Sequence, residues 1–579
     1  MGASYATRGG LSGVNPDRFG VARFAESELC LGAKNGSCTK LVWVELCWSR
    51  RSMLSPGNGG SAPVYRHALG HVTYERHCPE QTLLYRLMEK HYPALVEQLE
   101  FQGKSLPTHV HREFEAYLKC GRLEHGFLRV RCDKCHFDRL VAFSCKKRGF
   151  CPSCGARRMA ETAALLSDEV FPDVPLRQWV ISFPFPLRYL FAAHPQAMGK
   201  VLGIIYRAIS THLIHKAGYR LQDGATGAVT LIQRFGSALN LNIHFHILFL
   251  DGVYVYRDNR PPRFQRIKAP NKDELVDLVQ LISQRVGRCL ERQGLLEQDT
   301  ESAWLELQPA DDTDAMPHLL GSSVSYRIAV GPQQGRKAFM IRTIRPLDRP
   351  DPGPERMAKA NGFSLHAGVS CEGHQKDKRE RLCRYIARPA VAVPRLSLSS
   401  TGKVVYSLKT PYRDGTTQVA FDPVDFMARL AALVPKPRVN LTRYHGVLAP
   451  NHRWRGEVTP AKRGKGVKRI ANTDVRSPAE RHVARACPAL SGMSWAQRLK
   501  RVFNIDIAVC GRCGGSVRVI ACIEDQDIID RILAHLESKE QNTPALLHLA
   551  PPTRAPPETL PLFAGKEFSS TALSQQGRL

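Results

Sequence analysis

Residues 239–250 read LNLNIHFHILFL, and apolar and polar residues alternate through most of this stretch. Side chains of a β-strand point alternately to its two faces. One face would therefore carry Asn240, Asn242, His244 and His246, and the other face only the apolar residues between them. The pattern predicts a strand that is half core and half polar, whose two imidazoles can meet on a single divalent cation. The alternative is an amphipathic strand with two surface histidines and no metal.

The segments around this strand predict a mixed fold. Strands are expected at 177–183, 229–236, 323–331 and 337–345, and helices at 81–99, 108–118, 159–170, 187–216, 273–296 and in a segment ending at Pro389. The sequence shows no regular alternation of strands and helices and no glycine-rich phosphate loop. We therefore expect an α+β fold with a largely antiparallel sheet.

The charge of the chain points to a polyanionic partner. Its 579 residues include 82 Lys or Arg and 53 Asp or Glu, which gives a formal net charge of +29. Such an excess attracts nucleic acid, although a solvated basic surface is the alternative. No apolar run is long enough to cross a bilayer, and the N-terminus has no apolar signal core. We expect a cytoplasmic protein with no membrane partner.

Closely spaced cysteines predict a zinc site. The run RCDKCHFDRLVAFSCKKRGFCPSCGARRM (131–159) contains two CxxC pairs, Cys132 with Cys135 and Cys151 with Cys154. Two such pairs at this separation complete a tetrahedral thiolate site, and zinc is the metal that fits it. Other residues of the segment could replace a ligand or build a second site, namely Cys120, Cys145, His125 and His136.

The other cysteines give weaker signals. A third CxxC pair, Cys510 and Cys513, supplies two ligands, and Cys522 could add a third; a glycine-rich turn between strands is the alternative. Scattered cysteines such as Cys289 and Cys371 are interpreted as small buried hydrophobes. Basic residues surround the first two pairs and predict phosphate contacts, namely Lys146, Lys147, Arg148, Arg157 and Arg158.

A candidate nucleophile lies in KDKRERLCRYIARP (376–389). In a helix, Tyr385 would share one stripe with Lys378, Arg381 and Arg388, while apolar residues beside the stripe pack inward. A phenol between cations is well placed to receive a phosphodiester. Most of the 16 tyrosines are expected to be half-buried with a polar tip, and that is the alternative for this one.

Taken together, these motifs resemble the rolling-circle transposases of the insertion-sequence-91 group, and within it the ISCR branch. The resemblance rests on FSCKKRGFCPSCGARRM (143–159), QRFGSALNLNIHFHILFLDGVY (233–254), RYIARP (384–389) and RYHGVLAPN (443–451). These proteins are HUH (His-hydrophobic-His) nucleases, so the resemblance implies that His244 and His246 bind Mg²⁺ or Mn²⁺ and that Tyr385 attacks DNA. Two-tyrosine members carry another tyrosine one turn earlier, where this chain has Arg381.

The resemblance implies a third metal ligand without identifying it. His366, in GFSLHAGV (362–369), is the first choice and Asp251 the second. Because only one tyrosine is present in the motif, two strands held covalently at once would require two protomers, and hence a homodimer. Lys378, Arg381 and Arg388 are expected to contact DNA.

The expected function is the cutting and rejoining of single-stranded or hairpin DNA at mobile-element ends through a 5′-phosphotyrosine. The alternatives are a zinc-dependent DNA-binding regulator without catalysis, and a plasmid replication initiator or relaxase with the same chemistry. The expected organisation is a poorly ordered extension (1–75), a helical zinc-binding DNA-docking domain (76–172), an HUH nuclease domain (173–433), a basic DNA-contacting linker (434–502), a small CxxC module (503–540) and a disordered tail (541–579).

Overall fold

The computed structural model describes residues 78–256, 261–298, 303–305, 311–345, 356–463 and 508–541. The predicted N-terminal extension, the linker beyond residue 463 and the predicted tail beyond residue 541 lie outside the described residues. Within these ranges, no helix has the length and apolar character needed to cross a bilayer.

A six-stranded sheet organises the central part of the chain. All its neighbouring strands are antiparallel, and their order is β12 (Met357–Ala360), β13 (Phe363–Cys371), β3 (Leu176–Ser182), β6 (Leu241–Leu250), β5 (Gly227–Phe235) and β17 (Thr442–Gly446). Helices cover both faces, so the predicted mixture of helices and antiparallel sheet is confirmed. The edge strand β17 falls in the predicted basic linker, so the first part of that segment belongs to the sheet instead.

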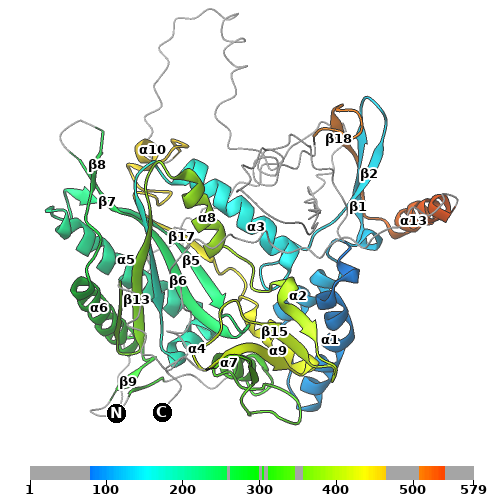
Figure 1. The fold of residues 1–579 in the computed structure, drawn as a ribbon, viewed down its shortest axis with the longest axis horizontal. Coiled ribbons are helices and arrows are strands. Elements are labelled where there is room, and N and C mark those ends of the chain that lie inside the picture. Colours follow the sequence, from blue (N-terminus) through cyan, green and yellow to red (C-terminus); the bar gives the residue numbers. More distant parts are fainter. Residues whose placement is uncertain are drawn as a thin grey trace, which may run out of the picture. The chain divides into compact units, whose positions relative to one another are not determined.

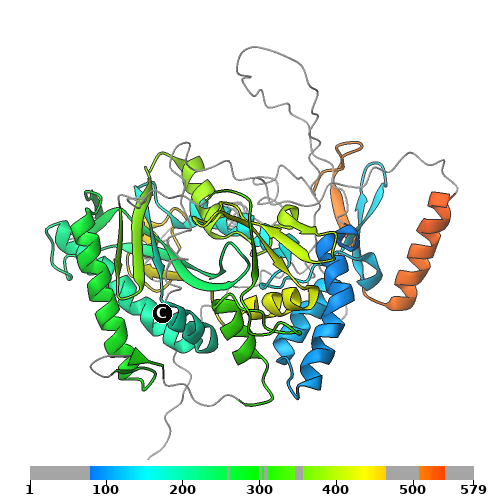
Figure 2. The same ribbon diagram turned by 60° about the horizontal axis from the view of Figure 1, so that its bottom comes forward.

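One face of the sheet carries the large apolar side chains of the histidine strand. Ile243, Phe245 and Ile247 point into a core shared with α4 (Phe185–Ala193), α5 (Pro195–Lys216) and α6 (Lys272–Glu291). Figure 2 shows α5 and α6 packed together, and α6 also contacts β13. The predicted long helix over 187–216 is therefore two helices, separated at His194.

The opposite face of the sheet is covered as well. There α3 (Pro152–Leu165), which continues into a π-helical turn (Leu166–Val170), lies beside α8 (Lys376–Ile386), as Figure 1 shows. Leu382 and Ile386 of α8 pack in one cluster with Leu231 and Leu248 of the sheet. Every residue of β6 is consequently buried, which contradicts the alternative of an amphipathic strand with two surface histidines.

The first CxxC pair lies in a small sheet that joins distant parts of the chain. β1 (Phe127–Cys132) and β2 (Asp138–Ala142) form a hairpin, and β18 (Val517–Ile523) pairs with the free edge of β1. α13 (Gln526–Gln541) follows β18. The predicted C-terminal module therefore does not stand alone but extends the N-terminal hairpin. Two helices at the predicted positions precede the hairpin, α1 (Leu83–Phe101) and α2 (Thr108–Leu118).

Smaller elements complete the fold. A second antiparallel sheet has the order β11 (Phe339–Arg342), β16 (Thr416–Phe421), β15 (Val404–Ser407) and β14 (Leu396–Leu398), and α9 (Pro423–Leu433) follows it. The remaining described strands and α-helices are β4 (Gly224–Ala225), β7 (Gly252–Val255), β8 (Arg263–Arg266), β9 (Glu297–Gln298), β10 (Ala303–Trp304), α7 (Met316–Val324) and α10 (Arg455–Val458).

The predicted strand at 323–331 is wrong, because α7 occupies the segment up to Val324 and turns follow it. Apolar side chains buried at helical spacing explain the difference, namely Met316, Leu319, Leu320 and Val324.

Candidate active site and metal centres

His244 and His246 lie side by side near the middle of β6. Their ring centroids are 4.9 Å apart, and the two residues are only 8% and 5% exposed. Across the sheet, His244 is paired with Ser182 on β3 and Gln233 on β5, so these three side chains lie on one face. The two histidines are thus held on a rigid central strand with little access to bulk water.

Hydrogen bonds restrict which ring nitrogens could bind a metal. Nδ1 of His244 lies 2.9 Å from the Asn242 carbonyl and donates to it, which leaves Nε2 with a lone pair. Nδ1 of His246 lies 2.7 Å from the Gln178 side-chain amide, and its Nε2 is buried without a hydrogen-bond partner. If Nε2 of His246 binds a metal, the ring proton must be on Nδ1, and Nδ1 then donates a hydrogen bond. A rotation of the Gln178 amide by 180° would place its oxygen where it can accept this hydrogen bond.

The protonation state of both histidines also suits metal binding. Burial lowers the pKa of His244 to about 4, and the nearby Arg388 and Arg188 act in the same direction. Burial lowers the pKa of His246 well below its usual value, with His244 and Arg388 adding to the effect. Both rings are therefore neutral at neutral pH and can offer lone pairs to a cation.

The structure brings Tyr385 to these histidines from more than a hundred residues away. Its ring centroid lies 6.3 Å from that of His246, with the two planes nearly perpendicular at 88°. The guanidinium carbon of Arg388 lies 4.7 Å from the Tyr385 ring centroid and the ammonium of Lys409 lies 5.3 Å from it. An imidazole and two cations therefore surround the phenol ring.

The cations around Tyr385 differ from the predicted stripe. α8 ends at Ile386, so Arg388 reaches the ring from beyond the helix rather than from its surface. Arg381 is exposed and Lys378 is half-buried. Lys409, which follows β15, was missed because nothing in its local sequence indicates that the second sheet approaches the tyrosine.

Gln233 is a further residue that sequence reasoning missed. It lies on β5 directly opposite His244, and its Nε2 donates to the Ile386 carbonyl at 2.6 Å. Its Oε1 is buried and has no hydrogen-bond partner. A buried oxygen without a partner beside His244 is an available metal ligand. The available signal was a lone amide within the apolar strand VTLIQRF (229–235).

The structure does not bring the predicted third ligands to the histidine pair. His366 on β13 is opposite Val180, which is itself opposite His246, so two strand spacings of about 4.8 Å each separate the two histidine backbones. Among the described residues, no group of three metal-ligating His, Cys, Asp or Glu side chains includes His244, His246 or His366. The carboxylate of Asp251 instead forms a buried bidentate ion pair with Arg177, at 2.9 and 2.7 Å.

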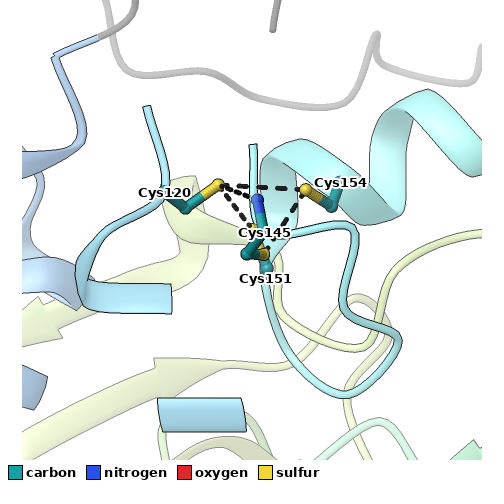
Figure 3. Close-up of side chains that lie close together, drawn as sticks. All are labelled: Cys120, Cys145, Cys151 and Cys154. Carbon is teal, nitrogen blue, oxygen red and sulfur yellow. Dashed lines mark hydrogen bonds between the residues drawn. The ribbon is translucent and has the colours of Figure 1, made fainter. Parts of the chain in front are cut away.

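The cysteines form two four-sulfur groups, neither of which is the predicted one. Cys151 and Cys154 meet Cys120 and Cys145, with sulfur–sulfur distances of 3.8, 3.8 and 3.5 Å where they are closest. Figure 3 shows these four side chains converging, two of them from the start of α3. The predicted partners of that pair, Cys132 and Cys135, meet Cys510 and Cys513 instead.

The chain geometry explains this correction. Cys132 ends β1, and the five residues of β2 then carry the backbone about 16 Å away from the first pair before Cys145 is reached. His125, His136 and Cys522 belong to neither group. The thiol of Cys522 contacts Glu524.

Three of the basic residues predicted to contact phosphates make internal contacts. Arg148 donates to the Val439 carbonyl at 2.7 Å, and Arg158 donates to the carbonyls of Lys146 and Lys147. Arg157 pairs with Glu161 at 3.1 Å, whereas the side chain of Lys146 is exposed.

Two protein-family models match the chain. The model described as "Putative transposase" (Y2_Tnp) matches residues 227–455 and spans His244, His246 and Tyr385. The model described as "Transposase zinc-binding domain" (Zn_Tnp_IS91) matches residues 87–183 and spans one four-cysteine group and half of the other. No curated protein and no solved structure matches the chain. Because the two models together cover more than half of the 579 residues, the chain belongs to the insertion-sequence-91 (IS91) family of transposases.

Proposed function

We propose that this transposase nicks and rejoins single-stranded DNA at the ends of a mobile element through a 5′-phosphotyrosine, the chemistry of rolling-circle transposition. The observation that carries the proposal is the position of the Tyr385 ring, 6.3 Å from the His246 ring and beside the cations of Arg388 and Lys409. A nucleophile, a neutral imidazole pair and two positive charges are the groups that phosphodiester transfer requires.

The residues that would hold a catalytic Mg²⁺ or Mn²⁺ are His244, His246 and Gln233. The unpartnered Nε2 of His246 and the unpartnered Oε1 of Gln233 support this assignment, because buried polar atoms normally have a partner. When bound, the metal would polarise the scissile phosphate and hold it in position for attack. Gln233 replaces the predicted His366 in this proposal.

The residues of the chain carry out the transfer as follows. The Tyr385 oxygen forms a bond to phosphorus as the bond from phosphorus to the 3′-oxygen breaks. The phenol loses its proton and the departing 3′-oxygen gains one, so charge and atoms balance. Arg388 and Lys409 offset the negative charge of the phosphate. Attack by a 3′-hydroxyl on the phosphotyrosine reverses these steps, so rejoining requires no nucleotide.

Two further features define the proposed DNA complex. The exposed Arg381 stands one helical turn before Tyr385, where a second tyrosine would be in a two-tyrosine enzyme. Each active site would then hold one covalent strand, and two strands would require a homodimer. Structural zinc on Cys120, Cys145, Cys151 and Cys154 would hold the start of α3, which packs against the tyrosine helix.

The test is Tyr385→Phe, which removes one oxygen and keeps the ring. We expect the variant to bind element-end DNA and Mn²⁺ but to form no covalent adduct and no nicked product on a denaturing gel. Tyr444→Phe is the matched control, because this tyrosine packs in the same core cluster but lies on the edge strand β17. Adducts formed by Tyr385→Phe would show that another residue is the nucleophile, whereas a wild type that binds DNA without forming any adduct would leave a zinc-dependent DNA-binding regulator as the better explanation. Comparing cleavage of element-end DNA with cleavage of plasmid-origin DNA separates the two enzymes, because a transposase should prefer element ends and a replication initiator should prefer an origin.

A further inference from the structure

We propose that Cys132, Cys135, Cys510 and Cys513 form a second zinc site, which fastens the C-terminal segment 508–541 to the N-terminal hairpin. Each half comes from a different end of the chain, and the zinc-binding family model ends at residue 183, far before the second pair. The inference does not depend on the proposed nuclease chemistry, since it concerns a different set of residues.

The sulfur positions match those of a tetrahedral zinc site. Cys132 and Cys513 have their sulfurs 3.5 Å apart, and Cys135 and Cys510 have theirs 3.6 Å apart. All four sulfurs lie within 4.8 Å of one another. A regular tetrahedron with zinc–sulfur bonds of about 2.3 Å has sulfur–sulfur edges of about 3.8 Å. The group therefore has the size of a zinc site.

Both halves are tight turns that present two sulfurs on one side. In the first, the backbone N–H of His136 donates to the Cys132 carbonyl at 3.1 Å. In the second, the N–H of Gly514 donates to the Cys510 carbonyl at 2.9 Å, with Gly514 at a φ of 68° that favours glycine. A side chain on Gly515 would meet the Cys132 sulfur at 2.9 Å, so only glycine allows the two turns to close on each other.

The surroundings argue against four reduced cysteines in an apolar core. Cys135 is exposed and Cys513 is half-buried, whereas buried hydrophobic cysteines would be enclosed. The neighbouring side chains are largely charged: Arg518 pairs with Asp133 at 2.7 Å, and the guanidinium of Arg512 stacks on the Phe137 ring at 3.8 Å. Four thiols that meet in such a polar setting are explained by a common ligand.

The site would fix how the two ends of the chain associate. Beside the sulfurs, β18 pairs with β1, and the backbone N–H of Asp133 donates to the Ser516 carbonyl at 2.8 Å. The side chains of β18 are mostly exposed, and its one buried residue, Ile523, packs in a small cluster with Phe127 and Ile529, so limited apolar burial holds this strand in place. Zinc would supply the missing stabilisation, and its removal would release β18 from the hairpin.

Zinc stoichiometry of the purified full-length chain tests the proposal. We expect two zinc ions in the wild type and one in Cys135→Ser or in Cys510→Ser, measured by elemental analysis. The double variant Cys135→Ser/Cys510→Ser should still hold one, because both residues serve the same ion. Adding Cys145→Ser to Cys510→Ser should remove both ions. Cys522→Ser is the control and should keep two, since its thiol lies outside the group.

Hydrogen exchange of the β18 backbone gives a second readout. We expect its amides to lose protection in Cys510→Ser, and not in Cys522→Ser. Where the variant does not fold, wild-type protein titrated with a chelator replaces it, and β18 should become unprotected as one of two ions leaves. A wild type with a single zinc, a double variant with fewer ions than either single variant, or β18 protection independent of zinc would each overturn the proposal.

Discussion

Replacing Gln233 by methionine should weaken metal binding without destabilising the metal-free protein. The substitution keeps the size of the side chain and removes both Oε1 and Nε2. Losing the hydrogen bond to the Ile386 carbonyl costs about 1 kcal/mol. Removing a buried oxygen that has no partner recovers an amount of the same order. The two effects offset each other, so the free energy of unfolding of the metal-free variant should stay within about 1 kcal/mol of the wild type.

The difference should appear when Mn²⁺ is added. At a concentration 100 times the dissociation constant, a ligand that binds only the folded state stabilises it by about 2.7 kcal/mol. Loss of a group that only contacts a metal ligand can weaken metal affinity up to about 100-fold, and we expect at least this effect for loss of a ligand. At the same Mn²⁺ concentration, binding would then stabilise the folded variant by only about 0.4 kcal/mol. The Mn²⁺-dependent stabilisation should therefore fall by about 2 kcal/mol.

Thermal unfolding with and without Mn²⁺ measures this difference, at roughly 2–4 °C per kcal/mol for a domain of this size. His244→Ala should abolish the Mn²⁺ response, and His366→Ala should keep it because His366 lies two strands away from His246. Gln233→Glu retains a ligand oxygen and should recover part of the response. Equal Mn²⁺ responses in Gln233→Met and the wild type would refute the role of Gln233, and a loss in His366→Ala would restore the earlier candidate.

Two further predictions concern stability. Asp251→Ala should lower the free energy of unfolding by about 3–5 kcal/mol in urea and leave the Mn²⁺ response unchanged, because it strips a buried guanidinium, Arg177, of its carboxylate partner; a change below 1 kcal/mol would contradict the ion pair's importance. Burial lowers the pKa of His445 to about 4, whereas its pKa in the unfolded chain is about 6.5. The contribution of neutral His445 to stability is therefore fully present above about pH 6.5 and is lost as the pH falls towards 4. His445→Gln should therefore reduce the stability difference between pH 7 and pH 5 by about 1–2 kcal/mol, and an unchanged difference would exclude this source.

The parts of the site that lie within one regular element could be predicted from local sequence. The two-residue period of LNLNIHFHILFL places His244 and His246 on one face, and burial on both faces does not alter that geometry. The helix of Tyr385 was predictable from Leu382 and Ile386, which do pack inward.

The contacts that depend on sheet order could not be predicted in the same way. Gln233 is opposite His244 only because β5 and β6 pair in one register, and β13 lies one strand further from the histidines than β3. The prediction of which cysteine pairs meet was wrong for a related reason. Spacing favours the nearest second pair, whereas the β1–β2 hairpin directs Cys132 and Cys135 towards a pair near the other end of the chain.

The pairing of β1 with β18 has a consequence for synthesis on the ribosome. The cysteines of the first group lie within 34 residues of one another, which are made in about 2–7 s at 5–20 residues per second. Cys135 and Cys510 are 375 residues apart, so β18, the third strand of the small sheet, is synthesised about 20–75 s after the hairpin. During that interval the residues of the central sheet emerge and can fold. A chain that terminates before residue 508 would therefore contain the histidine strand and the tyrosine helix, but its N-terminal hairpin would lack the third strand and the second cysteine pair.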